Sequence, residues 1–451
     1  MLTYELKKSP GVPLYEALYR CIRQDILSGT LPAGEKLPSK RALAQSLEVS
    51  KITVETAYNQ LLSEGFIRSV EKVGYFVETV EGHGARTSVP GDPGDEQKKE
   101  YPVDLTDTGT GHFPFSVWSK LQREVMLDYG EKLLLPLPNR GIPELRRAIA
   151  DHLAAFRGMH VDPRNILIGA GTDFLYNLLI QLLGRDKVFA VEEPGYRKIR
   201  KIYAAGGVRC VSALLDREGV RPDTLEEADV LHFSPSHHFP TGLVTPVSRR
   251  MELLSWATRG EKWIIEDDYD TEFRLEAHPK PAMQSLDGSG RVIYMNSFSK
   301  SLAPSIRISY MILPPDLMDR FQQELGFYSC TVPSFDQYTL ARFLSGGYFE
   351  KHINRMRKFY RLRRERVVQM LRSCAMADKL TILEQDAGLH FLLKVDTALT
   401  DAQLVQLLEQ HGIRILALSE YFHDRPEDRH TLVVNYSGLK EEKLQEALDS
   451  L

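Results

Sequence analysis

The sequence predicts two folded parts of different fold class: a small α+β head and a large α/β body that ends in a smaller C-terminal lobe. The 451 residues exceed what one ordinary core accommodates. Over residues 1–78, apolar residues follow a helical period and then an extended alternation. Residues 79–102 are rich in Gly, Pro and charge, which is typical of a linker. Beyond them, short β-type segments alternate with helical ones, which predicts a buried and mostly parallel sheet. The five predicted strands are ILIGA, VFAVEEP, VLHFSP, KWIIEDD and RVIYMNS.

Composition and charge exclude several classes of protein. With 43% apolar and 26% charged residues, the chain matches globular proteins, and its four scattered cysteines fit neither a disulfide framework nor a metal site. The longest apolar stretch, residues 166–184, contains Asp173, Asn177 and Gln181, which are costly in lipid. The N-terminus lacks the apolar core of a secretory signal. We therefore expect a cytoplasmic protein with neither a metal site nor a membrane contact.

The head is predicted to consist of three helices and a hairpin. Apolar residues at every fourth position predict a helix over residues 14–27, and Gly29 ends it. Ser39 can cap a second helix and Ser50 a third, with two residues between the helices. Residues 66–78 then form two extended runs that meet in a hairpin turn near residues 71–74. This order of elements is that of a winged helix-turn-helix. In that fold the second helix of the helix-turn-helix motif, here the helix capped by Ser50, enters the major groove of DNA.

Placement, rather than overall charge, carries the DNA-binding hypothesis, because the first 80 residues are almost neutral. Polar and basic side chains gather at the starts of the two motif helices and at the hairpin tip, where they can meet phosphates and base edges. The candidate contacts are Ser39, Lys40, Arg41, Ser50, Lys51, Thr53, Thr56, Lys72 and Gly74. The alternative interpretation is that they form the solvated face of a small helical domain.

The head resembles the winged-helix domain of GntR-type regulators in its LPSKRALA opening, its VSKITVETAY helix and its VGYFV wing. This resemblance covers the whole head and implies binding to double-stranded DNA. It assigns the contacts to Arg41, Ser50, Lys51, Thr53 and the wing residue Gly74. Glu55 stands where some members of the family carry an arginine.

The body carries one lysine in an informative setting, the SFSK run that follows the predicted strand RVIYMNS. Open parallel sheets place ligand groups at the carboxyl ends of their strands, and Lys300 stands at such an end. A lysine that forms a Schiff base needs a fixed amine, and a phosphorylated cofactor needs nearby hydroxyls and a positive charge. Ser297, Ser299 and Arg307 supply these. Taken alone, so short a pattern is more often a loop with surface charge.

Other strand ends add matching groups. Asp267 ends the strand KWIIEDD and can pair with a protonated pyridine nitrogen, and Tyr269 can donate to the phenolic oxygen of the same ring. Gly171 and Thr172 begin a helix after the strand ILIGA and can hold a phosphate, unless they are a routine helix cap. Tyr196, in VEEPGYRK, can stack on the cofactor. The turn SPSHHFPTG follows a further strand.

EEPGY, FPTG, EDDYD and SFSK, in this order, resemble the fold-type-I enzymes that use pyridoxal 5'-phosphate, over residues 104–451. With the head and linker, the chain resembles the MocR/GabR group of regulators. The resemblance implies an aminotransferase class I and II fold, with a large domain over residues 103–330 and a small lobe over 331–451. It also implies the cofactor roles given above, with Lys300 as the Schiff-base lysine, and a homodimer in which one head lies near the partner's body.

Three departures from that pattern concern catalysis. Phe239 stands where aminotransferases commonly have an asparagine, and Val433 lies in a stretch that lacks their carboxylate-binding arginine. Arg197 or Arg429 can substitute for it. The tract LLLPLPNRG also lacks the tyrosine that related chains often place before the glycine.

Three functions are compatible with these features. We favour a transcriptional regulator that senses the cofactor or a small amino compound, through an external aldimine, and so changes how its heads bind DNA. The second is an active aminotransferase, with full or residual transaminase activity, whose head only tethers it. The third is a dimerisation scaffold without a cofactor.

Overall fold

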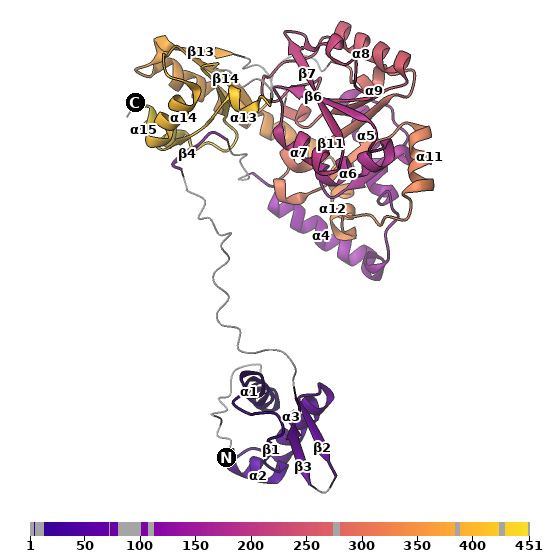
Figure 1. The fold of residues 1–451 in the computed structure, drawn as a ribbon, viewed down its shortest axis with the longest axis vertical. Helices are drawn as coiled ribbons and strands as arrows, with labels where there is room; N and C mark the ends of the chain where they lie inside the picture. The colour runs from indigo at the N-terminus through magenta and orange to yellow at the C-terminus, as the bar shows by residue number, and fades with distance from the viewer. Residues whose placement is uncertain are drawn as a thin grey trace. The chain divides into compact units, whose positions relative to one another are not determined.

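The computed structural model describes residues 4, 13–71, 73–79, 101–106, 112–273, 280–383, 388–423 and 429–449. The chain forms two compact units, residues 1–99 and 100–451, which are drawn in Figure 1. Most of the predicted linker lies outside the described residues. Among the helices that the structure describes, none is long and apolar enough to cross a membrane.

The head has the predicted three helices and hairpin. Its elements are α1 (Leu14–Ser28), α2 (Lys40–Ser46), α3 (Lys51–Ser63), β1 (Lys36–Leu37), β2 (Ile67–Val70) and β3 (Gly74–Val77). Gly29, in the left-handed conformation, ends α1, and the Ser39 and Ser50 side chains cap α2 and α3 as predicted. The short strand β1, which was not predicted, pairs with β3. The fully buried core includes Leu18, Ile22, Val54, Ala57, Tyr58 and Leu61.

The body is built on an eight-stranded sheet in the order β5-β12-β11-β10-β9-β6-β7-β8. Its strands are β5 (Ile166–Gly169), β6 (Val188–Glu193), β7 (Arg209–Asp216), β8 (Gly219–Val220), β9 (Val230–Phe233), β10 (Trp263–Asp267), β11 (Val292–Ser297) and β12 (Ser309–Ile312). All five predicted strands are present. The sheet is mostly parallel, but β12 runs antiparallel between β11 and β5, and β8 pairs antiparallel with β7.

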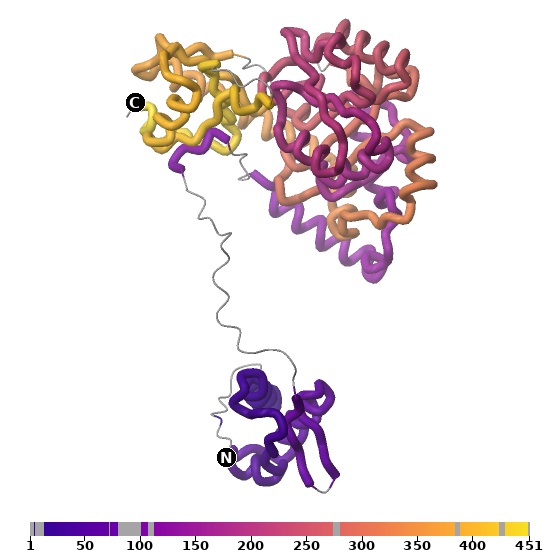
Figure 2. The backbone as a smooth tube through the Cα atoms, viewed as in Figure 1, coloured from indigo at the N-terminus to yellow at the C-terminus, as the bar shows by residue number. Residues whose placement is uncertain are grey.

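Helices bury both faces of this sheet, so alternate residues of one strand enter different cores. Ile166 and Ile168 of β5 pack in the cluster that includes α5, α12 and α13, whereas Leu167 packs with α6 and α11. The helices are α4 (Phe115–Tyr129), α5 (Pro143–Arg157), α6 (Thr172–Leu183), α7 (Arg197–Ala205), α8 (Val247–Gly260), α9 (Met283–Leu286), α10 (Phe298–Ser301), α11 (Pro315–Glu324), α12 (Ser334–Ser345) and α13 (Tyr348–Ser373). In Figure 2, the tube follows α4 and α12, which pack together although far apart in sequence.

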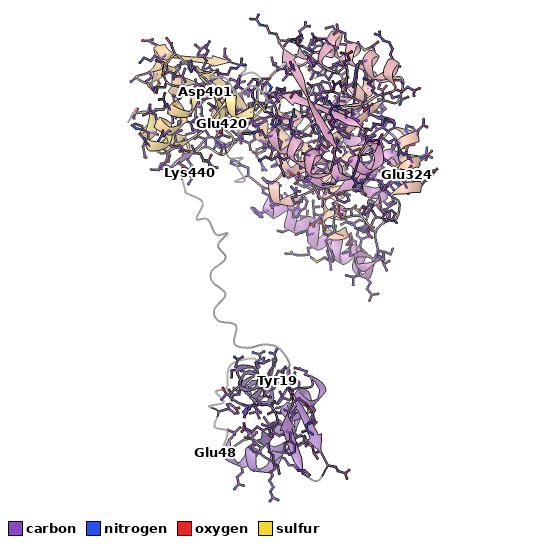
Figure 3. All side chains as sticks on the ribbon, in the orientation of Figure 1. Tyr19, Glu48, Glu324, Asp401, Glu420 and Lys440 are labelled. Carbon is purple, nitrogen blue, oxygen red and sulfur yellow. The ribbon has the colours of Figure 1, made fainter. Side chains whose placement is uncertain are left out.

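The C-terminal lobe contains a four-stranded sheet in the order β13-β14-β17-β16. Its elements are β13 (Leu380–Leu383), β14 (His390–Val395), α14 (Asp401–Gln410), β15 (Ile413–Arg414), β16 (Leu416–Ala417), β17 (Thr431–Asn435) and α15 (Glu441–Leu448). Buried Asp401, labelled in Figure 3, accepts hydrogen bonds from the backbone N–H groups of Arg429 and His430, at 3.0 and 2.8 Å. This fixes the start of β17.

Two contacts bear on where the large domain meets the small lobe. Strand β4 (Val103–Asp104), at the predicted start of the large domain, pairs in parallel with β15 of the small lobe. Helix α12, predicted to belong to the small lobe, packs against α4 and α5. The division at residue 330 stays a prediction.

Candidate functional site

The sheet register brings the predicted cofactor residues to one edge. Ser297, at the carboxyl end of β11, is opposite Ser309 of β12, which is opposite Gly169 at the carboxyl end of β5. Asp267 ends the neighbouring strand β10 and pairs in register with Met295. Because β5, β10 and β11 are parallel in direction, the loops that follow them meet at this edge, as in other open α/β sheets.

Asp267 is buried and held by side chains from two other elements. The Tyr176 hydroxyl, from α6, donates to Oδ2 at 2.7 Å, and His232 Nε2, from β9, lies 3.4 Å from the same oxygen. The Tyr203 hydroxyl contacts His232 Nδ1 at 2.7 Å. Because a carboxylate only accepts hydrogen bonds, the proton of a neutral His232 belongs on Nε2, and Nδ1 then accepts from Tyr203.

The second oxygen of Asp267 is different. Oδ1 is buried and, within the described part of the chain, has no hydrogen-bond partner. A buried polar atom without a partner is costly, and a carboxylate more so. The pKa values of Tyr176 and Tyr203 are raised well above their usual value by burial and then by the Asp267 charge, so both remain protonated donors. The site therefore fits a ligand that brings an N–H group to Oδ1, as a protonated pyridine ring does.

A second group of residues forms a cradle for an anion. Helix α6 begins at Thr172, directly after Gly171, whose φ is 88°. A Cβ at residue 171 would lie 2.3 Å from Nη2 of Arg307, so only glycine lets this guanidinium approach the start of the helix. The hydroxyls of Ser297 and Ser299 lie 2.9 Å apart. A helix N-terminus, a guanidinium and hydroxyls are together the groups that bind phosphate.

Lys300 lies in α10, just beyond β11, and is half-buried. Burial, and then the charges of His237, His238 and Lys300, lower the pKa of His390 well below its usual value, which indicates that Lys300 is close to this strand of the small lobe. The Tyr269 hydroxyl lies 3.2 Å from His237 Nδ1, which in turn lies 2.8 Å from Asp270 Oδ2. The predicted partner of a cofactor hydroxyl thus belongs to a buried polar cluster.

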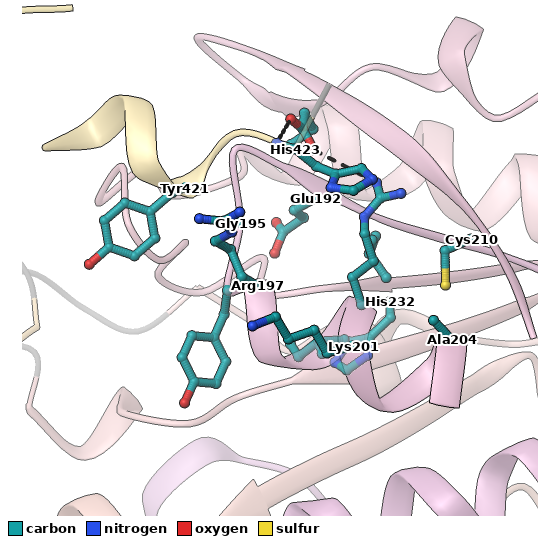
Figure 4. A pocket seen from close by; sticks show the side chains of 14 residues that line it. Glu192, Gly195, Arg197, Lys201, Ala204, Cys210, His232, Tyr421 and His423 are labelled. Carbon is teal, nitrogen blue, oxygen red and sulfur yellow. Dashed lines mark hydrogen bonds and ion pairs between the residues drawn. The ribbon is translucent and has the colours of Figure 1, made fainter. Parts of the chain in front are cut away.

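A cavity of about 390 Å³ opens between α7, the end of β6 and the segment around residues 421–423. Figure 4 shows His232, Arg197 and Tyr421 on its wall. Tyr196 also lines it, is 53% exposed and meets Phe239 edge to face. The stacking role of Tyr196 stays a prediction.

The two arginines predicted to replace the missing carboxylate clamp line different cavities. Arg197 lies in the cavity that also contains Tyr196 and His232, and its Nη1 donates to the Glu420 carbonyl at 3.0 Å. Arg429 lines a separate cavity of about 510 Å³ and stacks over Phe422. The first position is therefore the better one for a ligand that also meets the Asp267 cluster.

In the head, some side chains predicted to contact DNA are exposed, and others make hydrogen bonds or ion pairs within the head. Lys40 is only 18% exposed, and its Nζ lies 2.7 Å from Oε1 of Glu55, which joins α2 to α3. This hydrogen bond raises the pKa of Lys40 and lowers that of Glu55. Arg41 and Lys51 are exposed. Lys72 lies outside the described residues.

The hydroxyl candidates in the head make local hydrogen bonds. Ser50 Oγ accepts from the Thr53 N–H and lies 2.8 Å from Thr53 Oγ1, and Thr56 Oγ1 donates to the Ile52 carbonyl at 2.9 Å. Each hydroxyl keeps a further acceptor position. Gly74 opens β3 at a φ of 137°. Their contacts to DNA stay predictions.

Sequence reasoning missed the residues that hold Asp267. Tyr176 follows Thr172 by one helical turn, so the pattern could have placed it on the site face of α6. His232 lies in the predicted strand VLHFSP, but its approach to Asp267 depends on β9 lying beside β10. The sequence carries no signal for that strand order.

Both parts of the chain match known families. Residues 14–77 match the model of bacterial regulatory proteins of the gntR family, and residues 105–451 match that of aminotransferase class I and II. The chain is 36% identical to the uncharacterized HTH-type transcriptional regulator YdeL of Bacillus subtilis, over 100% of this chain and 98% of that protein. It is 34% identical to the probable rhizopine catabolism regulatory protein MocR of Rhizobium meliloti, over 99% and 94%.

Solved structures show the fold of the body. Kynurenine aminotransferase from Pyrococcus horikoshii matches with a TM-score of 0.68 and 24% identity, over 78% of this chain and 90% of that one. An archaeal alanine:glyoxylate aminotransferase matches with a TM-score of 0.70 and 22% identity, over 78% and 91%. The prediction of an aminotransferase fold is confirmed.

Proposed function

The chain belongs to the MocR/GabR group of GntR-type transcriptional regulators, and from this membership we propose that pyridoxal 5'-phosphate and a small amino compound control its binding to DNA. One observation carries the regulatory function: relatives named as transcriptional regulators match the whole chain, head and body together. The alternative of an aminotransferase with a tethering head is therefore disfavoured. We propose that the protein acts in the cytoplasm, where the DNA that it would bind lies.

The body fits the cofactor at several separate points. Asp267 would pair with the pyridine nitrogen through its unpartnered oxygen, and Arg307 with the start of α6 would hold the phosphate. Lys300 would supply the amine. When bound, the cofactor supplies an aldehyde that condenses with amines and a ring that withdraws electrons. A scaffold that never bound a cofactor would have no use for the unpartnered oxygen of Asp267.

The amino compound would enter the cavity beside Tyr196. Arg197, on the wall of this cavity, can bind a carboxylate or another anionic group of the ligand through the donors that the Glu420 carbonyl does not use. Regulation requires that this ligand bind two states of the protein with different affinity. The backbone bond from Gly195 N to the Tyr421 carbonyl, 3.1 Å long, joins the two lobes at the edge of this cavity. A ligand there can change how they close.

We propose a homodimer formed through an apolar face of the body. Large apolar side chains are exposed along α4 and the 3₁₀ turn after it: Phe115 (72%), Leu127 (77%), Leu134 (75%) and Leu135 (62%). Monomeric proteins seldom leave so many large apolar side chains of one segment exposed, and a second copy can cover them symmetrically. In this dimer one head lies near the partner's body, as the family resemblance implies.

The test uses the purified full-length protein and duplexes selected from a random pool. We expect the protein to become coloured with pyridoxal 5'-phosphate, and its affinity for a selected duplex to change when a panel of amino acids and amines is added. The proposal would be contradicted if the affinity for the selected duplex did not change with the cofactor or with any amine. Steady-state transamination without any specific duplex binding would instead establish the aminotransferase alternative.

A further inference from the structure

The DNA-facing helix carries one side chain whose exposure is unusual for its chemistry. Ile52, in the first turn of α3, is 74% exposed, although it is large and apolar. Leaving such a side chain in water forgoes the favourable free energy of burying it. Its backbone carbonyl accepts a hydrogen bond from Thr56, so this turn of the helix is well formed. The exposure of Ile52 therefore belongs to an ordered surface.

The head itself cannot bury Ile52. The inward face of α3 carries Val54, Tyr58 and Leu61, all fully buried. Ile52 lies on the opposite face together with Thr56 and Asn59, which follow it by four and seven residues and are also exposed. An isoleucine on this stripe is covered only when something docks against the outer face of α3.

The surroundings of this stripe favour nucleic acid as the occupant. Lys51 is exposed at the start of α3, and Arg41 is exposed in the first turn of α2. Lys40 pairs with Glu55, which reduces the acidic charge on this face of α3. Cationic side chains and the capped start of α3 suit the phosphates that border a major groove.

We propose that the Ile52 side chain contacts the 5-methyl group of a thymine in the major groove and thereby selects an A·T pair at that position of each half-site. Thymine is the base that presents an apolar group in this groove, and apolar side chains pair with its methyl group. The minor groove offers no such group. This inference rests on the proposed function, because it needs the head to bind DNA.

The experiment measures the affinity of the full-length protein, at fixed salt, for duplexes selected from a random pool. Each thymine of the selected duplex is replaced in turn by deoxyuridine, which removes only the methyl group. Burying one such group is equivalent to about fourfold in affinity. We therefore expect about fourfold weaker binding for one thymine per half-site, and no change at most of the others.

Two variants assign the effect to Ile52. I52A should bind the thymine and deoxyuridine duplexes equally, and it should fold normally because alanine is a better helix former than isoleucine. V73A is the matched control: Val73 is 50% exposed at the hairpin tip, so its loss removes similar apolar surface from the same head. It should leave the fourfold methyl effect intact, whatever it does to overall affinity.

The outcomes are distinct. The assignment of Ile52 is overturned if no deoxyuridine replacement changes the affinity of the wild-type protein, or if I52A still binds the deoxyuridine duplex more weakly than the thymine duplex. In both cases the proposed function stands. If the pool yields no selected duplex under any cofactor or amine condition, both fail. Loss of the effect in I52A but not in V73A supports the proposal.

Discussion

The body and the head each contain a side chain that is unusual for its surroundings. In the body it is a polar group that is buried, and in the head it is an apolar group that is exposed. In the body, Asp267 is buried with one oxygen that lacks a hydrogen-bond partner among the described residues. In the head, Ile52 is apolar and 74% exposed. A ligand that satisfies the first must be small enough to enter and must carry a donor. A partner that satisfies the second must be large enough to cover an open surface. The comparison suggests that the body selects its ligand by hydrogen bonding, whereas the head selects its partner in part by burying apolar surface.

The largest expected effect concerns Lys300. In K300A, covalent attachment of pyridoxal 5'-phosphate should be lost completely, because Lys300 is the amine that the proposed site uses. Borohydride reduction followed by peptide mass mapping measures this. K201A, which removes an exposed lysine from the cavity wall, should keep the reduced adduct. An adduct on another lysine in both wild type and K300A would remove the basis of the cofactor site.

The next effect separates the two regions most sharply. D267N should weaken cofactor binding roughly hundredfold, because losing one partner of a buried charge pair costs about 3 kcal/mol. An absorbance titration with pyridoxal 5'-phosphate measures it. The same variant without cofactor should bind a selected duplex as wild type does. Unchanged cofactor affinity would show that the unpartnered oxygen does not face the ring.

A smaller effect is expected at the residue that holds Asp267. Y176F removes the 2.7 Å hydrogen bond to Oδ2 and should weaken cofactor binding about tenfold, since a hydrogen bond to a charged group contributes about 1.5 kcal/mol. The same titration applies, with Y328F as a control, because the Tyr328 hydroxyl donates to Gln181 Oε1, at 3.0 Å, and not to Asp267. Equal affinities for Y176F and wild type would indicate that burial alone holds the carboxylate.

The smallest effect is a difference in pH response between the regions. Burial, and then the His237 charge, lower the pKa of His238 to about 3, against 6.5 for an exposed histidine. The folded body therefore binds fewer protons than the unfolded chain between these values. The contribution of His238 to the stability of the body is fully present above pH 6.5 and falls by about 1.4 kcal/mol per pH unit below it.

Residues 1–79 contain no histidine, so the head should lack this dependence. Thermal unfolding of the full chain from pH 7.5 to 5 measures both transitions. H238Q should remove the share of His238 and so make the response of the body less steep, with His152 and His390 supplying the rest, whereas replacing the exposed His411 should not. A head transition that shifted as steeply as that of the body would contradict this account.

From the sequence we identified candidate site residues at the ends of strands. We missed the side chains from neighbouring elements that hydrogen-bond to them. Lys300 and Asp267 could be found because each lies at or just after the end of a recognisable β segment, and Arg307 because it lies in the same run as Lys300, SFSKSLAPSIR. Tyr176 and His232 could not, because their approach to Asp267 depends on which elements become neighbours. The antiparallel strand β12 was missed for a related reason, since a four-residue strand, Ser309–Ile312, inside a loop-like stretch carries no sign of direction.

The head shows the same limit in its polar contacts. The caps at Ser39 and Ser50 are local and were predicted correctly. The ion pair of Lys40 with Glu55 joins two helices, so Lys40, a predicted phosphate contact, also forms a link within the head. Local patterns therefore predicted the helices but not which cations remain exposed.

The pairing of β4 with β15 has a mechanical consequence. The segment through which the chain from the head enters the body is fastened to the small lobe, whereas Asp267 ends β10 of the large sheet and Lys300 lies in α10, just beyond β11. If a molecule in the cavity drew one lobe toward the other, the anchorage of the connecting segment would travel with the smaller lobe. The displacement would then pass to the connector without any rearrangement of the eight-stranded sheet.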